Sequence, residues 1–412
     1  MAAMNSTISI AALLTLMTAV AATAQRAPAL EIRFSPAGHV YLAEDNRQFG
    51  IANLQIQNIA IVNTGSEPVR VEEVLIEVLA GDEEVVRTDR HSARMLASRW
   101  SRLKGYLDLP GTMKSEDARY RFRELLGTPP SLSSTTSLDP GTAIYVSRRF
   151  TFVDAGVQMI DGKPTPVGPD RIRVSVRGVS SGGTPVTTQN HLRVIQYIPT
   201  TEYHFPLKGR WYIAASGSVR SHHRTQPVHE FALDLIQIGE GGRSHKGTGT
   251  SHSDYYAFEQ NVHSVADGIV ETVYDGILDT RLRRQDESLE AYRKAVLQPI
   301  AASDTPHGTG GNQVIVAHKD GEYSSYAHLM NDSIRVRKGD HVKRGQVLGQ
   351  IGLSGDGYEP HLHFQLTDGP HIEYSRGIPA IFGNVRPVRF SSTIDDNGRR
   401  QLQSGEFVET VD

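Results

Sequence analysis

Short runs of apolar residues, separated by turn-forming residues, dominate the chain from residue 25 to residue 199. The run LQIQ at residues 54–57 alternates apolar and polar side chains, and an apolar run over 59–62 follows it before the turn NTGS at 63–66. Such runs are typical of β-strands, because successive side chains of a strand point to opposite faces. Further strands are predicted over residues 69–79, 143–152, 171–176 and 191–197.

Many short strands joined by Gly, Pro and Asn turns favour a β-sandwich of immunoglobulin-like character over residues 25–199. The pattern breaks over residues 90–127, where two helices are predicted, the second beginning at Ser115 and ending at Gly127. Residues 90–126 hold nine Lys and Arg against four Asp and Glu, a local excess of 9 − 4 = +5. A solvated helix surface accounts for this excess better than a site for an anionic polymer.

The pattern changes again near residues 200–210, which we interpret as a linker. A second β-rich domain is predicted over residues 211–390, followed by a C-terminal tail over 391–412. Two segments interrupt this domain: residues 239–261, rich in Gly, Ser and His, and residues 279–311, with a charged helix near 286–296. Long insertions usually lie at the rim of a domain, where binding loops also lie. The chain is therefore predicted to be mainly β.

The N-terminus has the composition of a secretory signal. Residues 1–25 include no charged side chain, and the apolar or small run from Ile8 to Ala22 leads into the A-x-A pattern at residues 22–24. This run is shorter than the roughly 20 apolar residues that a membrane helix needs. We expect a signal peptide over residues 1–24 and an exported protein without stable membrane insertion. A retained membrane anchor is the alternative, because no Lys or Arg precedes the run.

Composition narrows the possible chemistry. The 412 residues include 43 Lys and Arg and 46 Asp and Glu, and the net charge of −3 argues against a nucleic-acid partner bound through bulk charge. With 38% hydrophobic residues the chain can bury real cores, which excludes wholesale disorder. The absence of Cys excludes disulfides, thiol catalysis and thiolate metal sites. Any metal must be held by carboxylates and by the 17 histidines.

Three histidines are predicted to lie at the ends of strands. In the run PHLHFQL at 360–366, His361 and His363 are two residues apart and so point to the same face of a strand. A hairpin over residues 313–329 places His328 at the end of its return strand. Two imidazoles on one face can serve as two metal ligands, or as one ligand and one catalytic group.

A carboxylate interrupts another apolar strand. Asp234 lies in the run FALDL at residues 231–235. Burying an unpaired charge costs several kcal/mol, so this residue requires a cation or hydrogen-bond donors. His222, His223 and His229 lie upstream of it. Two imidazoles and one carboxylate, with water in the fourth position, are the usual arrangement of a catalytic zinc site.

These segments together resemble the LytM/lysostaphin family of zinc metalloendopeptidases, which cut peptide bridges in bacterial peptidoglycan. The matching runs are GNQVIV at 311–316, YAHL at 326–329, VRKGDHVKRGQVLG at 336–349 and PHLHF at 360–364, and VADGIV at 265–270 resembles the strand that follows the family's Asp ligand. The resemblance covers roughly residues 211–385 and implies an antiparallel β catalytic domain of LytM type.

The resemblance also implies roles for particular residues. Asp234 and His363 match the second and third zinc ligands of the family. His328 and His361 match its two non-ligand histidines, which position the attacking water and stabilise the oxyanion. Zinc lowers the pKa of bound water from about 16 to about 7, which gives a nucleophile near neutral pH.

The first zinc ligand departs from the common pattern. Many members have His four residues before the Asp, where this chain has Glu230. Some members take the ligand from an upstream His-Arg segment, which His223 and Arg224 match. His223 is our first choice for this ligand, His222 the second and His229 the third.

The function implied is an exported zinc metalloendopeptidase, with Zn²⁺ as cofactor, that hydrolyses cross-links or stem peptides of peptidoglycan. The alternative is a non-catalytic LytM-like domain that binds peptidoglycan or regulates another hydrolase. Residues 336–349 also resemble a biotinyl or lipoyl carrier, but a carrier has no use for the histidines. A cleavable signal without Cys favours the Gram-negative periplasm, with secretion as second choice. The N-terminal domain is expected to position or to occlude the catalytic one.

Overall fold

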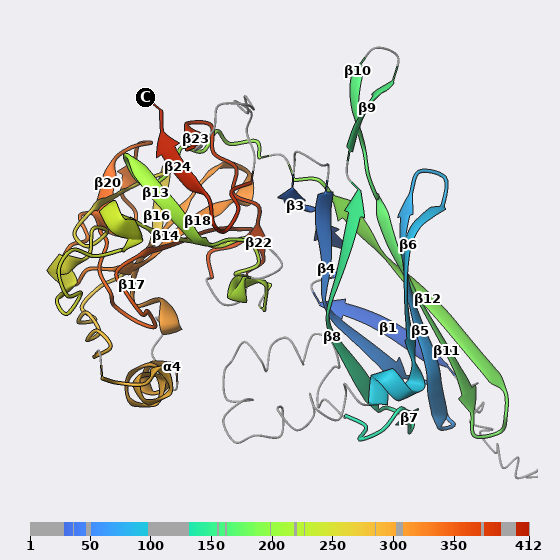
Figure 1. Cartoon of the computed structure of the whole chain (residues 1–412). Coiled ribbons are helices and arrows are strands. Elements are labelled where there is room, and N and C mark those ends of the chain that lie inside the picture. Colours follow the sequence, from blue (N-terminus) through green and yellow to red (C-terminus); the bar gives the residue numbers. More distant parts are fainter. Residues whose placement is uncertain are drawn as a thin grey trace, which may run out of the picture.

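The structure is a computed structural model, which describes residues 29–35, 37–46, 51–97, 132–154, 156–160, 163–197, 199–217, 221–225, 227–284, 286–301, 308–371, 375–388 and 401–411. The predicted signal peptide and nearly all of the predicted helical insertion lie outside these residues. The described chain forms two β-rich units, drawn in blue to green and in yellow to red (Figure 1). The mainly β prediction is confirmed.

The N-terminal unit is built from two antiparallel sheets and a hairpin. Strands β1, β4 and β3 form one sheet in that order, with β8 also paired to β4; the other sheet has the order β2-β12-β11-β5-β6, with β7 paired to β5 and β2 parallel to β12. The strands are β1 (Leu30–Ser35), β2 (His39–Tyr41), β3 (Ala43–Asn46), β4 (Ile51–Asn63), β5 (Val69–Ala80), β6 (Glu84–Ser92), β7 (Ser137–Leu138), β8 (Ala143–Asp154), β9 (Gly156–Ile160), β10 (Lys163–Val167), β11 (Arg171–Ser180) and β12 (Pro185–Ile195).

Side chains from both sheets of this unit share one apolar core. Leu54 and Ile56 of β4 pack in the same cluster as Ile76 of β5 and Val174 of β11. This alternation along the strands is what the sequence predicted for residues 54–57. The immunoglobulin-like topology remains a prediction.

The C-terminal unit is organised around a ten-stranded sheet with the order β19-β16-β17-β18-β21-β14-β13-β24-β23, in which β22 also pairs with β21, and β15 and β20 form a separate pair. The strands are β13 (Arg210–Ala215), β14 (Leu233–Ile236), β15 (Asn261–His263), β16 (Gly268–Tyr274), β17 (Asn312–Ala317), β18 (Tyr323–Leu329), β19 (His341–Val342), β20 (Val347–Gln350), β21 (Leu362–Thr367), β22 (Gly377–Ile378), β23 (Val385–Pro387) and β24 (Phe407–Thr410).

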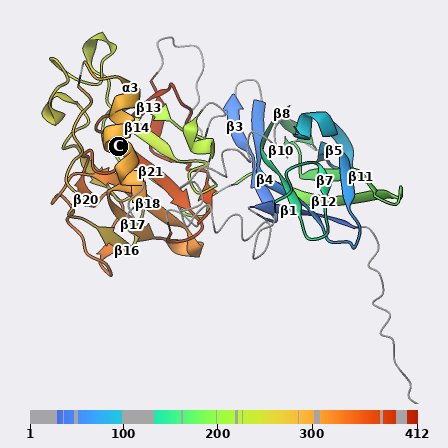
Figure 2. The ribbon, with the colours of Figure 1, turned by 90° about the horizontal axis from the view of Figure 1, so that it is seen from below.

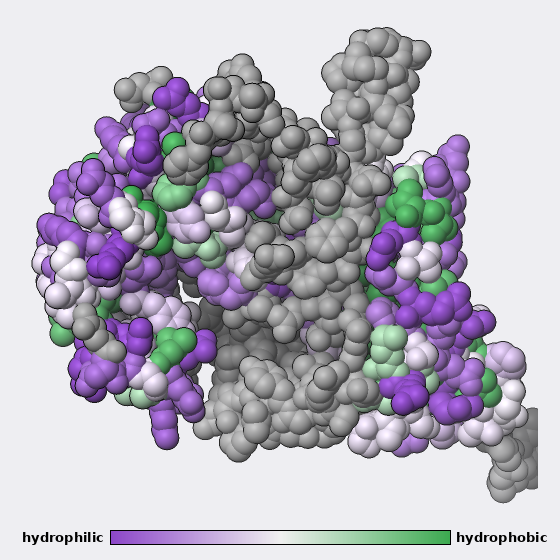
Figure 3. Space-filling model, in the orientation of Figure 1, coloured by the Kyte–Doolittle hydropathy of each residue, from purple (hydrophilic) through white to green (hydrophobic). Residues whose placement is uncertain are grey.

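The helices of this unit are short and lie in its loops. The predicted charged helix is present, over α3 (Leu289–Tyr292), a π-helical turn η5 (Arg293–Leu297) and α4 (Gln298–Ala301). The 3₁₀ turns are η2 (His222–Thr225), η3 (Glu240–Gly242), η4 (His252–Asp254), η6 (Gly308–Gly310) and η7 (Lys319–Gly321). No helix in the described part of the chain is both long enough and apolar enough to cross a bilayer. The face in Figure 3 is mostly hydrophilic, with apolar residues scattered over it.

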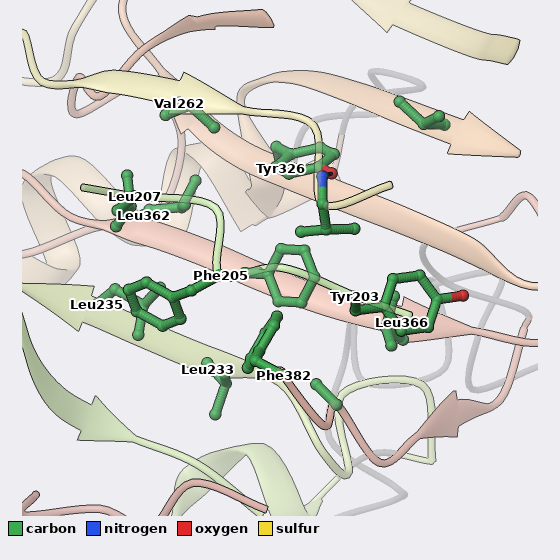
Figure 4. Packing of buried hydrophobic residues seen from close by; sticks show 14 of the residues in the cluster. Tyr203, Phe205, Leu207, Leu233, Leu235, Val262, Tyr326, Leu362, Leu366 and Phe382 are labelled. Carbon is green, nitrogen blue, oxygen red and sulfur yellow. Dashed lines mark hydrogen bonds between the residues drawn. The ribbon is translucent and has the colours of Figure 1, made fainter. Parts of the chain in front are cut away.

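The predicted linker contributes to the core of the C-terminal unit. Tyr203, Phe205 and Leu207 are all buried and belong to its apolar cluster, where the Phe205 ring meets Phe382 edge-on at 5.3 Å between centroids (Figure 4). The sequence analysis interpreted 200–210 as a linker because the residue pattern changes there. Its apolar residues at alternate positions pack inward instead.

The predicted C-terminal tail also belongs to the sheet. Phe407–Thr410 form β24, which pairs with β13 and places Val408 opposite Trp211. Both of these side chains are buried. The sheet therefore extends past residue 390, where the sequence analysis ended the domain.

Two matched substitutions test whether β24 is part of the sheet. Val408→Asp puts an unpaired carboxylate at a fully buried position, so we expect the free energy of unfolding to fall by about 3 kcal/mol or more. Val411→Asp makes the same change where 37% of the side chain is exposed, and should alter stability by about 0.5 kcal/mol or less. Urea denaturation followed by tryptophan fluorescence measures both. Equal stabilities would mean that residues 401–411 are a tail after all.

Candidate metal centre

Asp234 and His363 lie side by side near the middle of the ten-stranded sheet. They are opposite each other in the antiparallel pair β14 and β21. On the other side of β21, Ala327 of β18 lies opposite His363, so His328 follows at the end of β18. His361 immediately precedes β21. The strand register thus brings together one carboxylate and three imidazoles that the sequence predicted separately.

His223 reaches the carboxylate from η2, the turn between β13 and β14. Its Nε2 atom lies 3.2 Å from Oδ2 of Asp234, and only 3% of its side chain is exposed. On the other side of the ring, Nδ1 donates to the carbonyl oxygen of Ala232 at 3.0 Å. A proton fixed on Nδ1 leaves the lone pair of Nε2 directed at the site, as metal-binding imidazoles require.

His363 presents its other nitrogen to the same carboxylate. Nε2 donates to Oε1 of Gln365 at 2.9 Å, and Nδ1 lies 3.0 Å from Oδ1 of Asp234. With the proton on Nε2, the Nδ1 lone pair faces a carboxylate, and a cation between them removes the repulsion. Two site-facing nitrogens and a carboxylate without any thiolate are a donor set that suits Zn²⁺. The residues therefore fit the zinc that the sequence analysis expects.

His361 and His328 stand beside this donor set. Nε2 of His361 lies 3.8 Å from Oδ1 of Asp234, and its Nδ1 donates to the carbonyl of Glu359 at 2.8 Å. Nδ1 of His328 donates to the carbonyl of Ser354 at 2.8 Å, and the two rings are 4.6 Å apart between centroids. Both imidazoles thus hold a proton on Nδ1 and keep Nε2 available.

His328 has an uncommon backbone conformation. Its φ is 60°, a region that non-glycine residues rarely adopt and that costs about 1–3 kcal/mol. The backbone around it is held: Gly352 N donates to the His328 carbonyl at 3.0 Å, and the ring is tied to Ser354. This strain turns the side chain at the end of β18 toward His361.

The electrostatics of the cluster favour an ionised carboxylate at Asp234. Burial alone would raise the pKa of the Asp234 carboxyl, but the imidazoles of His223, His363 and His361 outweigh it and hold the pKa well below its usual value. Burial would lower the pKa of His363, but the neighbouring carboxylate of Asp234 raises it. Burial and the neighbouring imidazoles hold the pKa of His328 well below its usual value, so this ring is neutral near pH 7.

The other two candidates for the first ligand lie close by in different settings. His222 has 74% of its side chain exposed, and its Nε2 is 3.6 Å from Oδ2 of Asp234. A ring nitrogen of His222, a ring nitrogen of His223 and a carboxylate oxygen of Asp234 all lie within 4.8 Å of one another. The ring of His229 lies 6.3 Å from that of His223 and 5.3 Å from that of His363.

Glu230, which stands where many family members have their first His, points away from this cluster of ligands. It is 2% exposed, and its Oε1 lies 3.2 Å from Nη1 of Arg224. Gln365 contacts His363 as described. Tyr326 does not contact the site histidines through its hydroxyl, which bonds to Val265 N and Ser324.

No sequence pattern predicted the backbone carbonyls that fix the imidazoles. Ala232, Glu359 and Ser354 act through their main-chain oxygens, and any residue type can supply a carbonyl. Arg224 was noted only as part of a His-Arg pair; its burial and its partners in β4 were not anticipated. The alternation at residues 54–57 indicated a polar face there, without indicating what covers it.

Two imidazoles and a carboxylate, with two further histidines beside them on an antiparallel sheet, form a donor set that could hold a single metal ion. Sequence comparison agrees with it. The model for peptidase family M23 matches residues 244–373, which include His328, His361 and His363 but not His223 or Asp234. The lipoprotein NlpD of Yersinia enterocolitica is 37% identical over 73 residues, which are 18% of this chain and 72% of that protein. Through its C-terminal region, the chain belongs to peptidase family M23.

Other relatives are similar over short stretches of their length. The cell division protein DipM of Caulobacter vibrioides is 40% identical over 74 residues, 18% of this chain and 12% of that protein. The peptidoglycan DD-endopeptidase ShyA of Vibrio cholerae is 40% identical over 79 residues, 19% of this chain and 17% of that protein. The chain thus spans less than a fifth of the length of these two relatives. The catalytic domain of lysostaphin from Staphylococcus simulans aligns with 41% of this chain and 88% of its own, at 16% identity and a TM-score of 0.23.

The three upstream histidines can be separated by metal content. If His223 is the ligand, His223→Ala should leave the purified protein with less than about a tenth of the wild-type zinc, because a three-residue donor set loses one member. His222→Ala changes a mostly exposed neighbour and should retain close to one zinc per chain. Mass spectrometry of the metal after dialysis measures both. A zinc-loaded His223→Ala variant would transfer the assignment to His222 or His229.

Proposed function

We propose that the protein is an exported zinc metalloendopeptidase that hydrolyses peptide cross-links or stem peptides of bacterial peptidoglycan. One observation carries the proposal: the metal-ligand atoms of His223, Asp234 and His363 lie together. A hydrogen bond on the far side of each imidazole ring leaves its site-facing nitrogen free. A degenerate, non-catalytic domain has no need to preserve that arrangement together with His328 and His361.

In this proposal the metal is held by Nε2 of His223, the carboxylate of Asp234 and Nδ1 of His363. Bound zinc supplies an activated water near neutral pH and polarises the scissile carbonyl. Gln365 keeps the proton of His363 on Nε2, and the Ala232 carbonyl keeps that of His223 on Nδ1. These contacts orient both ligands before substrate arrives.

The two remaining histidines handle protons and developing charge. Because their Nδ1 protons are fixed on backbone carbonyls, His328 and His361 offer Nε2 as a proton acceptor. An imidazole of this kind accepts a proton at Nε2 from the attacking water and returns it from the same atom to the leaving amine. Once protonated, the same nitrogen also donates to the oxyanion.

The proposed substrate class is supported by the names of the relatives and by the predicted location of the protein. ShyA is named a peptidoglycan DD-endopeptidase, and lysostaphin and the glycyl-glycine endopeptidase ALE-1 also match this region. The predicted signal peptide and the lack of Cys favour a periplasmic enzyme, and so D-Ala–diaminopimelate cross-links over glycine bridges. Secretion is the second choice for its location.

The second candidate is a metal-free domain that binds peptidoglycan or regulates another hydrolase. It is favoured by Glu230 at the position of the family's usual first ligand, and it would make His223 an ordinary buried histidine. Zinc content separates the two candidates, since a regulator of this kind does not need the metal.

Digestion of purified peptidoglycan sacculi tests the proposal. The protein should release cleaved peptides that mass spectrometry identifies, and a zinc chelator should abolish the release. His363→Ala should lose both zinc and hydrolysis. His361→Ala should keep zinc and lose activity by about 100-fold or more, because it removes a proton-transfer group but no ligand.

Two results would contradict the assignment. Hydrolysis retained by His363→Ala would exclude a zinc mechanism at this site. A folded, zinc-loaded wild type that releases nothing from sacculi would favour a binding role or an inhibited state.

A further inference from the structure

The turn η2, which carries His223, is held by hydrogen bonds from the N-terminal unit. Strands β3 and β4 lie on the side of that unit that faces the C-terminal one, in both views (Figures 1 and 2). Asn53, Gln55 and Gln57 alternate with Leu54 and Ile56 along β4 and are at most 2% exposed. A polar row along a strand is normally solvated, and here it is buried against η2.

The contacts converge on Arg224, the residue next to His223. Its Nη2 donates to Oδ1 of Asn53 at 2.8 Å, and its Nε donates to Oε1 of Gln55 at 3.2 Å. Nε2 of Gln55 in turn donates to the backbone carbonyl of Arg224 at 2.6 Å. Gln55 therefore holds both the side chain and the main chain of the residue that follows the candidate ligand.

Glu230 and Gln57 complete this polar cluster. Arg224 is 1% exposed, and a buried guanidinium requires a counter-charge, which Glu230 supplies at 3.2 Å from Nη1. Nε2 of Gln57 donates to the other oxygen of Glu230 at 3.2 Å. The departure from the family pattern thus has a use here: the residue in place of the usual first ligand anchors the turn that brings His223 to the site.

Contacts with aromatic rings reinforce this polar cluster. The Arg224 guanidinium lies over the Phe231 ring at 5.4 Å, and Phe231 meets Tyr41 of β2 edge-on at 6.0 Å. Tyr41 belongs to the core cluster of the C-terminal unit and carries Arg376 over its other side at 4.6 Å. Arg224 and Phe231, which both lie between His223 and Asp234, therefore contact strands β4 and β2 of the N-terminal unit.

We infer that Asn53, Gln55 and Gln57 of the N-terminal unit are positioning residues for the metal centre, acting on His223 through Arg224. Asp234 and His363 are placed by paired strands, whereas His223 stands on a short turn. Fixing residue 224 at both its side chain and its carbonyl restricts the one ligand that the sheet does not fix. The inference depends on the proposed function only in requiring that His223 binds the metal.

Two substitutions on the same strand of the full chain test it. Gln55→Leu removes both hydrogen bonds between Gln55 and Arg224. The zinc affinity should fall about 10–100-fold, the usual effect of losing a partner of a metal ligand. Asn63→Leu is the matched control: it removes three side-chain hydrogen bonds roughly 26 Å along β4 and so destabilises the unit without touching η2. Its zinc affinity should stay within about twofold of wild type.

Competition with a chromogenic chelator gives the affinities, and the visible absorption of the Co²⁺-substituted protein reports the coordination geometry. The Co²⁺ spectrum should change in Gln55→Leu and not in Asn63→Leu. Added free zinc should restore the activity of Gln55→Leu by raising its kcat, with KM unchanged. The activity of His361→Ala should not be restored by added zinc. If Gln55→Leu does not fold, Arg224→Lys removes the guanidinium contacts with Asn53 and Gln55 from the other side and should also weaken zinc binding.

Equal zinc affinities in wild type and Gln55→Leu would overturn the inference, and so would an equal loss in Asn63→Leu. A wild type that binds zinc but cleaves no sacculi would refute the proposed function alone, because the affinities are measured without substrate. A wild type without zinc would refute both.

Discussion

A single buried carboxylate organises the centre of this protein. Asp234 lies in an apolar strand, and its charge is tolerated because the strand register and one turn bring imidazoles to it from several directions. Each imidazole is fixed on its far side by an oxygen, from a backbone carbonyl or from Gln365. The sheet order, the strained φ of His328 and the buried turn at His223 are all conditions for that convergence.

The sequence predicted the chemistry of this centre better than its surroundings. Two-residue spacing was enough to place His361 and His363 together, and an acidic residue in the run FALDL was enough to require a cation. His223, chosen from a His-Arg pair, lies closer to the carboxylate than His222, at 3.2 Å against 3.6 Å. Local pattern was sufficient wherever the backbone period decided the direction of a side chain.

The failures have a common physical origin. Residues 200–210 and 401–411 are short, carry charges and have too few apolar residues to indicate a core, and both are ordered by distant partners. Likewise, alternation in β4 distinguishes an apolar face from a polar one but does not tell which is solvated. Asn53, Gln55 and Gln57 are buried by another unit. Long-range burial is not encoded in any window of a dozen residues.

The strand pair that closes the sheet has a consequence for how fast the protein folds. Strand β13 is joined to β24 through Arg210 and Glu409, and the pair of Asp234 and His363 also links distant parts of the chain. Contacts of such high sequence separation require loop closure before they contribute any stability, and chains dominated by them fold slowly. The C-terminal unit therefore brings Asp234 and His363 together late in folding, so the newly made chain passes through a period in which its sheet edges are open and the candidate metal centre is not yet assembled.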